Sequence, residues 1–176
     1  MVIRMKQETK RKIMQPIQDF RLPRYSEIPN VGLYLEQTSK YISEYLAPLG
    51  DYALTASMIS NYVKRDLVAN PVKKQYGRDQ IAYLFFIAVA KSVLSLDALM
   101  NFIQLQKHSY PLETAYDYFC RQLEGMLKYA FEITEFIDLD DADSSDEKRL
   151  LYSCIAAVTQ KIYLEKCLAA IAEEET

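Results

Sequence analysis

Residues 54–104 read LTASMISNYVKRDLVANPVKKQYGRDQIAYLFFIAVAKSVLSLDALMNFIQ, and this stretch decides the fold because it combines helix-start signals with clustered positive charge. Thr55 stands at an N-cap position, where its hydroxyl oxygen can accept a hydrogen bond from a free backbone N–H of the next turn. Apolar side chains then recur at helical spacing, at Ala56, Met58, Ile59, Tyr62 and Val63. The pattern predicts a short helix that ends near Asp66.

Two lysines follow this helix in a predicted turn. Leu67-Val68 has the character of a brief extended segment, and Asn70-Pro71 predicts a turn because proline excludes its predecessor from the α region. Lys73 and Lys74 then lie between Pro71 and Gly77, on a loop or small hairpin that we call the wing (residues 71–77). A helix is expected to begin again near Arg78, which gives the order helix, wing, helix.

The helix after the wing has a broad apolar face, followed by a break. Its apolar positions are Ile81, Leu84, Phe85, Ala88 and Val89. Residues 91–95 interrupt the pattern, and Ser95 is predicted to cap a further helix that contains Leu96, Leu99 and Ile103. The stretch therefore predicts three helices and one wing.

These residues resemble the winged helix-turn-helix head of the MerR family of bacterial transcription regulators. The resemblance is carried by Tyr62, Leu67-Val68, Pro71, the basic wing, Tyr76, Ile81, Leu84, Ile87 and Leu94-Ser95-Leu96-Asp97. Together with LPRYSEIPN at Leu22 and LYLEQ at Leu33, it also resembles an uncharacterised bacterial family known only as MerR-like. It covers roughly residues 22–106.

The resemblance implies a mostly α fold with a MerR-like head, a small β wing and a helical carboxy-terminal unit. The expected parts are a basic amino-terminal arm (1–24), a DNA-binding domain (25–107) and a helical hairpin for dimerisation or regulation (108–176). The implied function is sequence-specific DNA binding in transcription regulation. Two departures stand out, since Ser60-Asn61-Tyr62 replaces the family's Arg-Tyr-Tyr run and Asp66 replaces a glycine.

The candidate DNA-binding residues lie on the first helix and the wing. Helical spacing places Ser57, Ser60, Asn61 and Lys64 opposite the apolar face, where polar side chains suit base edges or phosphates. An ordinary solvated face is the alternative. The complete predicted set is Ser57, Ser60, Asn61, Tyr62, Lys64, Arg65, Lys73, Lys74, Gln75, Tyr76 and Arg78. The basic side chains are expected to pair with phosphates and the three short polar ones to give specificity.

Charge is distributed unevenly along the 176 residues, whose formal net charge is −3. Residues 1–24 carry seven basic and two acidic side chains, and residues 55–110 carry seven and three. Residues 25–54 carry one and four, whereas residues 111–176 carry six and fifteen. A basic head on an acidic tail is typical of a protein that presents one face to phosphate. The basic opening is either a DNA-touching arm or a frayed terminus.

The carboxy-terminal unit is predicted to begin at Pro111, which suits a first helical turn. Its long apolar stripe contains Leu112, Ala115, Tyr116, Phe119, Leu123, Met126, Leu127, Ala130, Ile133, Phe136 and Ile137. Ser144 to Glu147 resembles a capping box that starts a final helix. The two helices are expected to form an antiparallel hairpin that covers the head or leaves a surface for a homodimer. The stripe indicates core rather than a ligand pocket.

No catalytic, metal or cofactor site can be assembled from the sequence. The aspartates between Asp138 and Asp143 lack the glycine turn and the final glutamate of a calcium loop, which favours a solvated connector over a metal site. Cys120, Cys154 and Cys167 are odd in number and widely spaced, which favours buried thiols, with redox or metal sensing as the alternative. With His108 as the single histidine and no glycine-rich phosphate loop, no enzyme is expected.

The expected compartment is the cytoplasm. The longest apolar run, residues 81–90, is far shorter than the ~20 residues that span a bilayer, and the amino terminus lacks the pattern of a signal peptide. The expected partners are double-stranded DNA and a second copy of the chain, with no membrane and an unspecified effector. The competing hypothesis is a protein-interaction module that has lost DNA binding, which the absence of the family's arginine at Ser60 favours.

Overall fold

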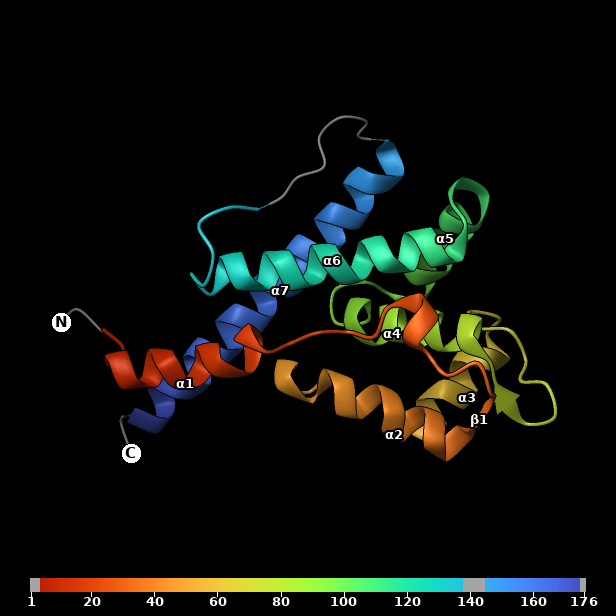
Figure 1. Cartoon of the computed structure of the whole chain (residues 1–176), viewed down its shortest axis with the longest axis horizontal. Helices are drawn as coiled ribbons and strands as arrows, with labels where there is room; N and C mark the ends of the chain where they lie inside the picture. The colour runs from red at the N-terminus through yellow and green to blue at the C-terminus, as the bar shows by residue number, and fades with distance from the viewer. Residues whose placement is uncertain (1–3, 138–144, 175–176) are drawn as a thin grey trace.

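The computed structural model describes residues 4–137 and 145–174. These residues form seven α-helices and one two-stranded antiparallel sheet (Figure 1). The helices are α1 Gln7–Gln18, α2 Leu35–Leu46, α3 Ala56–Lys64, α4 Arg78–Ala90, α5 Leu96–Ser109, α6 Leu112–Ala130 and α7 Asp146–Glu174, and the strands are β1 Leu33–Tyr34 and β2 Gln75–Tyr76. The prediction of a mostly helical chain with a small β element is confirmed.

Helix α4 is the centre of the fold. Most of its side chains are buried, as in a helix that has neighbours on all sides. It packs against α2, α6 and α7, and Figure 1 shows it between α2 and α6. The ring of Phe85 lies 6.0 Å from that of Tyr41 and 5.9 Å from that of Tyr45 on α2, and 6.2 Å from that of Tyr116 on α6. One continuous core therefore joins the two units that the sequence suggested.

The predicted helix starts at Thr55 and Ser95 are confirmed. The Thr55 hydroxyl oxygen accepts a hydrogen bond from the Met58 N–H at 3.1 Å, and the Ser95 hydroxyl oxygen accepts one from Ala98 at 3.2 Å. Helix α3 ends as predicted before Asp66, whose φ of 60° lies in the left-handed region. Glycine is the usual residue at such a helix end, so this aspartate costs backbone strain.

The wing is a tight hairpin whose second strand pairs with a segment far back in the chain. Val72 bridges to Gln75, and the two residues between them are the lysines, with φ of 51° and 65°. Strand β2 then pairs antiparallel with β1, which precedes α2. A Cβ atom on Gly32 would lie 2.6 Å from the Gln75 Cβ, so this close pairing requires glycine. The prediction of a small hairpin is confirmed. The pairing of its second strand, β2, with β1 was not predicted.

The predicted amino-terminal arm is mostly a packed helix. Helix α1 contacts α6 and α7 and buries Ile17. The Lys6 N–H donates to a carboxylate oxygen of Glu174 at 3.1 Å, and the Thr9 hydroxyl donates to the same oxygen. Figure 1 accordingly shows α1 beside the last turns of α7. The apolar side chains behind the basic opening hold it against α7, so residues 7–18 are not a free arm.

Helices α6 and α7 pack together, but the expected antiparallel hairpin is wrong. Both run in the same general direction and cross (Figure 1). The hydroxyl of Ser109, just before α6, donates to Glu147 in the first turn of α7 at 3.1 Å, while Phe131 after α6 lies 5.2 Å from the Tyr163 ring. The connection of about fifteen residues is long enough to return along a helix of this length, roughly 28 Å.

Two smaller expectations about this region also change. The apolar stripe does not continue through Phe136, which is 83% exposed, because α6 ends at Ala130 and the chain turns at Glu132 with a φ of 57°. The hydroxyl oxygen of Ser145 accepts from the Lys148 N–H at 3.4 Å, one residue later than the predicted cap. The acidic connector and Ser144 lie outside the described residues. Within residues 4–137 and 145–174, no helix is long and apolar enough to cross a bilayer.

Candidate nucleic-acid interface

Helix α3 is held by α2 in a fixed orientation. The Ser39 hydroxyl donates to the Leu54 carbonyl at 2.5 Å, and the Leu54 N–H donates to the Ser43 hydroxyl oxygen at 3.3 Å. Ile59 and Tyr62 are buried beneath α3. The opposite side of α3 is therefore presented to solvent on a rigid support.

The predicted residues of α3 divide by exposure. Ser57, Asn61 and Lys64 are exposed, as is Arg65 at its end, and Ser60 is half-buried. Tyr62 is only 6% exposed and belongs to the core, so its assignment to a DNA-binding surface is wrong. The helical spacing had already placed it on the apolar face.

The predicted residues of the wing divide in the same way. Lys73 and Lys74 are exposed at the tip of the hairpin. Tyr76 is 4% exposed and packs in the core, so it is not available to DNA. Gln75 is half-buried and sits over Gly32, where its role is strand pairing. Only the two lysines of this group can reach a partner freely.

Gln80 fixes the base of the wing and was not foreseen from the sequence. Its side-chain N–H groups donate to the carbonyls of Ala69 and Asn70, both at 2.9 Å, and its side-chain oxygen accepts from the Gly77 N–H at 2.6 Å. The only sequence signal was a glutamine three residues after Gly77, the spacing of a capping box. Gln80 thereby makes the wing a fixed projection from α4.

Arg78 holds the fold together, contrary to its predicted role as a phosphate contact. Its Nε donates to the Ile28 carbonyl at 3.0 Å and its Nη2 donates to the Ser26 carbonyl at 3.3 Å. The guanidinium carbon also lies 5.5 Å from the centre of the Tyr25 ring. A guanidinium with these partners is committed to residues 25–28, and we remove it from the candidate interface.

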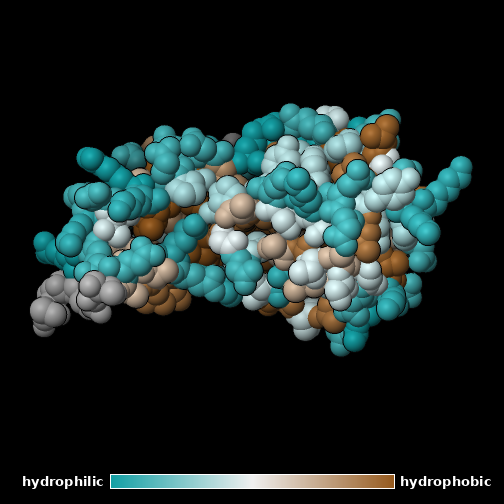
Figure 2. Space-filling model, turned by 90° about the horizontal axis from the view of Figure 1, so that it is seen from below, coloured by the Kyte–Doolittle hydropathy of each residue, from teal (hydrophilic) through white to brown (hydrophobic). Residues whose placement is uncertain are grey.

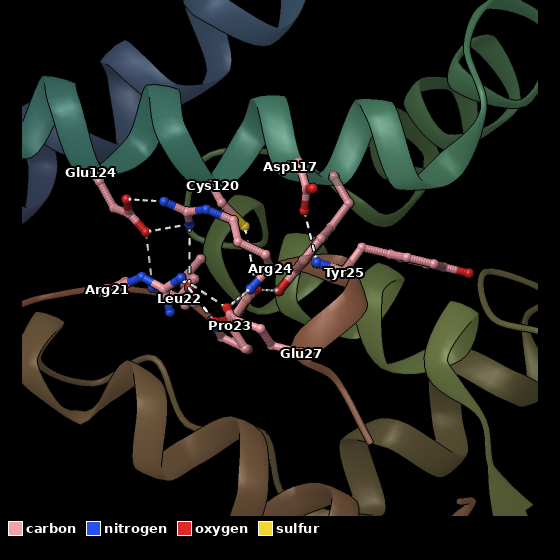
Figure 3. A network of polar contacts seen from close by, with 10 residues as sticks. Arg21, Leu22, Pro23, Arg24, Tyr25, Glu27, Asp117, Cys120 and Glu124 are labelled. Atoms are coloured by element: carbon pink, nitrogen blue, oxygen red, sulfur yellow. Dashed lines mark hydrogen bonds and ion pairs between the residues drawn. The ribbon is translucent and has the colours of Figure 1, made fainter. Parts of the chain in front are cut away.

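Residues 20–29, which we call the strap, are tied to α6 by a network of charged hydrogen bonds (Figure 3). The two terminal nitrogens of Arg24 donate to the two carboxylate oxygens of Glu124, each at 2.7 Å. Glu124 also accepts from the Leu22 N–H at 2.9 Å, and Asp117 accepts from the Tyr25 N–H at 2.7 Å. The Arg24 side chain is only 22% exposed, and the hydrogen bond to Glu124 raises the pKa of its guanidinium above the ordinary value of arginine.

The strap also reaches the start of α4. The Tyr25 hydroxyl donates to Asp79, and this hydrogen bond, followed by burial, raises the pKa of Tyr25 to about 12. Together with the bonds of Arg78, it connects α6 through the strap to the residue that follows the wing. The strap thus fixes the position of the wing relative to the rest of the molecule.

Four cations remain at the candidate interface, namely Lys64, Arg65, Lys73 and Lys74. None of their side chains forms a hydrogen bond or ion pair with any part of the chain that the structure describes. Asp66 is the only carboxylate between residues 55 and 78. At the end of the molecule that holds α3 and the loop after it, Figure 2 shows hydrophilic side chains projecting into solvent among smaller hydrophobic patches. This end can attract a polyanion.

The remaining chemistry-bearing side chains do not build a site. All three cysteines are buried and free, and burial raises the pKa of Cys120 to about 12 and that of Cys154 to about 11. The thiols of Cys120 and Cys154 are therefore unreactive at neutral pH, because the thiolate is the nucleophile. No group of three metal-ligating side chains comes together in the described ranges.

Comparison with known proteins identifies one family. The family described as a domain of unknown function, DUF1836, matches residues 23–119, more than half of the chain. The match begins within the strap and ends in α6, so it contains α2 to α5, the wing and Arg24 but not Glu124. No curated protein and no solved structure matches the chain. The chain belongs to the DUF1836 family.

Proposed function

We propose that this protein is a cytoplasmic, sequence-specific regulator of transcription that binds double-stranded DNA with a MerR-like winged helix-turn-helix head. In this proposal α2 supports α3, α3 enters the major groove, and the wing lies along the phosphate backbone. The head comprises residues 25–107, and the remaining helices hold it and join two copies. The order of elements and the unpaired cations support this assignment.

One observation carries the proposal, and it is the pair of lysines at the tip of the wing. Both have positive φ, a conformation that asparagine and glycine adopt easily in a two-residue hairpin turn and that lysine adopts at a cost. Neither lysine side chain contacts another described residue through a hydrogen bond or ion pair. Local strain held without an internal contact points to a role outside the folded chain.

The roles of the individual residues follow from exposure. Lys73 and Lys74 pair with phosphates from the wing, and Lys64 and Arg65 do so from the end of α3. Ser57 and Asn61 are the exposed polar side chains on α3 and read base edges, with Asn61 suited to adenine. Ser60, half-buried, borders this contact.

A homodimer completes the proposal, because one short helix and one wing give little discrimination, whereas two copies related by symmetry read two half-sites. Two exposed leucines on α7 form the proposed dimer interface, which we call the seam. Leu164 is 56% and Leu168 is 58% exposed, and they lie one turn apart on this long helix. Sedimentation of the Leu164→Glu, Leu168→Glu variant as a monomer, beside a dimeric parent, supports this seam. A monomeric parent with and without DNA contradicts it.

The experiment that tests the function is a salt titration of binding to random and selected DNA duplexes. Each phosphate contact contributes about 0.9 to the slope of log affinity against log salt, so four cations in each head give a slope of about −4 for one head and up to about −7 for two. Genomic fragments selected by the protein supply the specific duplex. Affinity that does not change with salt contradicts the proposal.

A second candidate function is that of a protein-interaction module, and the apolar surface of the head favours it. Val31 is 75% and Val72 is 73% exposed, and Tyr34 and Met58 are also exposed on the same part of the molecule. A helix-groove interface built on these side chains is insensitive to salt. The same titration therefore separates the two functions.

A further inference from the structure

A cavity lies between α5, α6 and the first turns of α7. Its volume is ≈ 240 Å³, and a second cavity of ≈ 60 Å³ shares Phe102, Gln106, Ala115 and Leu151 with it. The parallel course of α6 and α7 creates this space, because it brings the start of α7 beside the start of α6 (Figure 1). The sequence predicted core here, and the packing leaves a space instead.

The floor of the cavity is apolar. Phe102 and Leu105 line it from α5, Ala115 from α6 and Leu151 from α7. The smaller cavity continues with aromatic side chains, including Phe119. A volume of this size holds about eight water-sized groups, yet an apolar surface offers water few hydrogen bonds. An apolar ligand body therefore suits the floor better than solvent.

The polar groups of the wall are mostly committed to the protein. The Gln106 side-chain oxygen accepts from the Tyr83 hydroxyl at 2.7 Å, and its nitrogen donates to the Tyr110 carbonyl at 2.8 Å. Glu147, the one carboxylate of the lining, accepts from Ser109, and hydrogen bonds led by its own backbone N–H lower its pKa. These groups shape the wall and leave little for a ligand to bond.

Two cations lie at the rim. Arg121 on α6 is exposed, and its guanidinium has no hydrogen bond or ion pair among the described residues. Lys148 on α7 places its ammonium nitrogen 5.6 Å from the centre of the Tyr118 ring, which also lines the cavity. Glu147 stays ionised beside them, because a hydrogen bond from the Ser109 hydroxyl does not neutralise a carboxylate, and the two cations and one anion of the lining leave a net charge of +1.

We propose that this cavity binds a small carboxylic acid of about eight to ten non-hydrogen atoms with an apolar body. The body lies against Phe102, Leu105 and Leu151. The carboxylate lies at the rim, where Arg121 holds it with the bidentate geometry that guanidinium groups provide. The guanidinium of Arg121 repels an organic cation, and a neutral ligand cannot form an ion pair with it. The proposal does not depend on DNA binding.

Calorimetric titration of the full chain with octanoate tests it, with octan-1-ol as a neutral probe of the same length. We expect saturable binding of one octanoate per chain and at least tenfold weaker binding of octan-1-ol. Arg121→Gln is expected to weaken octanoate binding about tenfold while binding of the alcohol is unchanged. Arg149→Gln is the matched control, because Arg149 is also exposed and does not line the cavity.

Several results overturn the proposal. They are the absence of saturable octanoate binding, equal binding of octanoate and octan-1-ol, and equal weakening by Arg121→Gln and Arg149→Gln. A cavity-filling variant, Ala115→Phe, is expected to abolish binding of both probes, and retention of binding by a folded variant places the ligand elsewhere. Since Arg121 is exposed, its variant folds and decides the matter even if Ala115→Phe does not.

Discussion

The strap and the wing are both basic, yet their cations do opposite things. Arg24 in the strap is largely shielded and forms two hydrogen bonds to Glu124, whereas Lys73 and Lys74 at the wing tip are exposed and have no described partner. The hydrogen bonds to Glu124 stabilise the observed conformation of Arg24. The two lysines adopt an unfavourable positive φ, and no hydrogen bond or ion pair of their side chains with a described residue compensates for it.

The difference teaches how to separate structural charge from functional charge. A cation that contributes to folding is surrounded by acceptors from distant parts of the chain, and its removal leaves those acceptors unsatisfied. A cation that acts on a partner has no such acceptors, and its removal leaves the fold intact. Arg78 moves from the second group to the first by this criterion, because its donors reach Ile28 and Ser26.

The largest expected effect is on stability, from Arg24→Ala. Breaking a shielded ion pair leaves Glu124 without its counter-charge, and a partly exposed pair is expected to cost about 2–3 kcal/mol, less than the ~3–5 kcal/mol of a fully buried one. Arg21→Ala is the matched control, because the pair of Arg21 with Glu27 is about half exposed and contributes less than ~1 kcal/mol. Urea denaturation measures both. If the two variants lose the same free energy of unfolding, the Arg24–Glu124 pair stabilises the fold no more than the exposed Arg21–Glu27 pair does.

Alkaline pH is expected to destabilise the folded state through the buried thiols of Cys120 on α6 and Cys154 on α7. Burial raises the pKa of Cys120 from 9.0 to about 12 and that of Cys154 to about 11, so the folded state keeps these thiols protonated when the unfolded state does not. The contribution of the two thiols to the free energy of unfolding is therefore constant below their unfolded pKa and falls as pH rises towards 12, by up to about 1.4 kcal/mol per pH unit for each thiol. Denaturation at several pH values measures the slope, and Cys120→Ala is expected to reduce it.

The sequence predicted what depends on neighbouring residues. The caps at Thr55 and Ser95, the turn after Asn70-Pro71 and the end of α3 at Asp66 all arise within a few residues of their signals. Tyr62 shows the limit of resemblance, since the helical spacing placed it inward while the family pattern placed it in the site.

What the sequence did not predict depends on contacts across the whole chain. Arg24 and Glu124 are one hundred residues apart, and no local pattern distinguishes their pair from exposed charges. The parallel course of α6 and α7 follows from a long connection and from packing on α4, neither of which has a periodic signature. The cavity beside Arg121 exists only because of that course, so apolar spacing alone indicated a filled core.

A smaller effect is expected for Asn61, the polar residue at the centre of the exposed side of α3. Asn61→Ala is expected to lose about 1–2 kcal/mol of discrimination at one base pair, within the range of a bidentate adenine contact, while binding to random DNA hardly changes. A base-by-base binding profile measures the change, with the melting temperature as a control. An unchanged profile with a lower melting temperature makes Asn61 a structural residue.

The most direct test of the central claim exchanges the wing lysines for residues that suit their backbone. Lys73→Asn, Lys74→Gly removes two charges and relieves the positive φ, and Asp66→Gly relieves the same kind of strain without removing a cation. Both variants are expected to gain about 0.5–1 kcal/mol of stability. Affinity for random and selected DNA, measured at one fixed salt concentration, is expected to fall at least tenfold for the wing variant and to hold or rise for Asp66→Gly. Unchanged affinity in a stabilised wing variant would contradict the account, because the strained lysines would then serve no external partner.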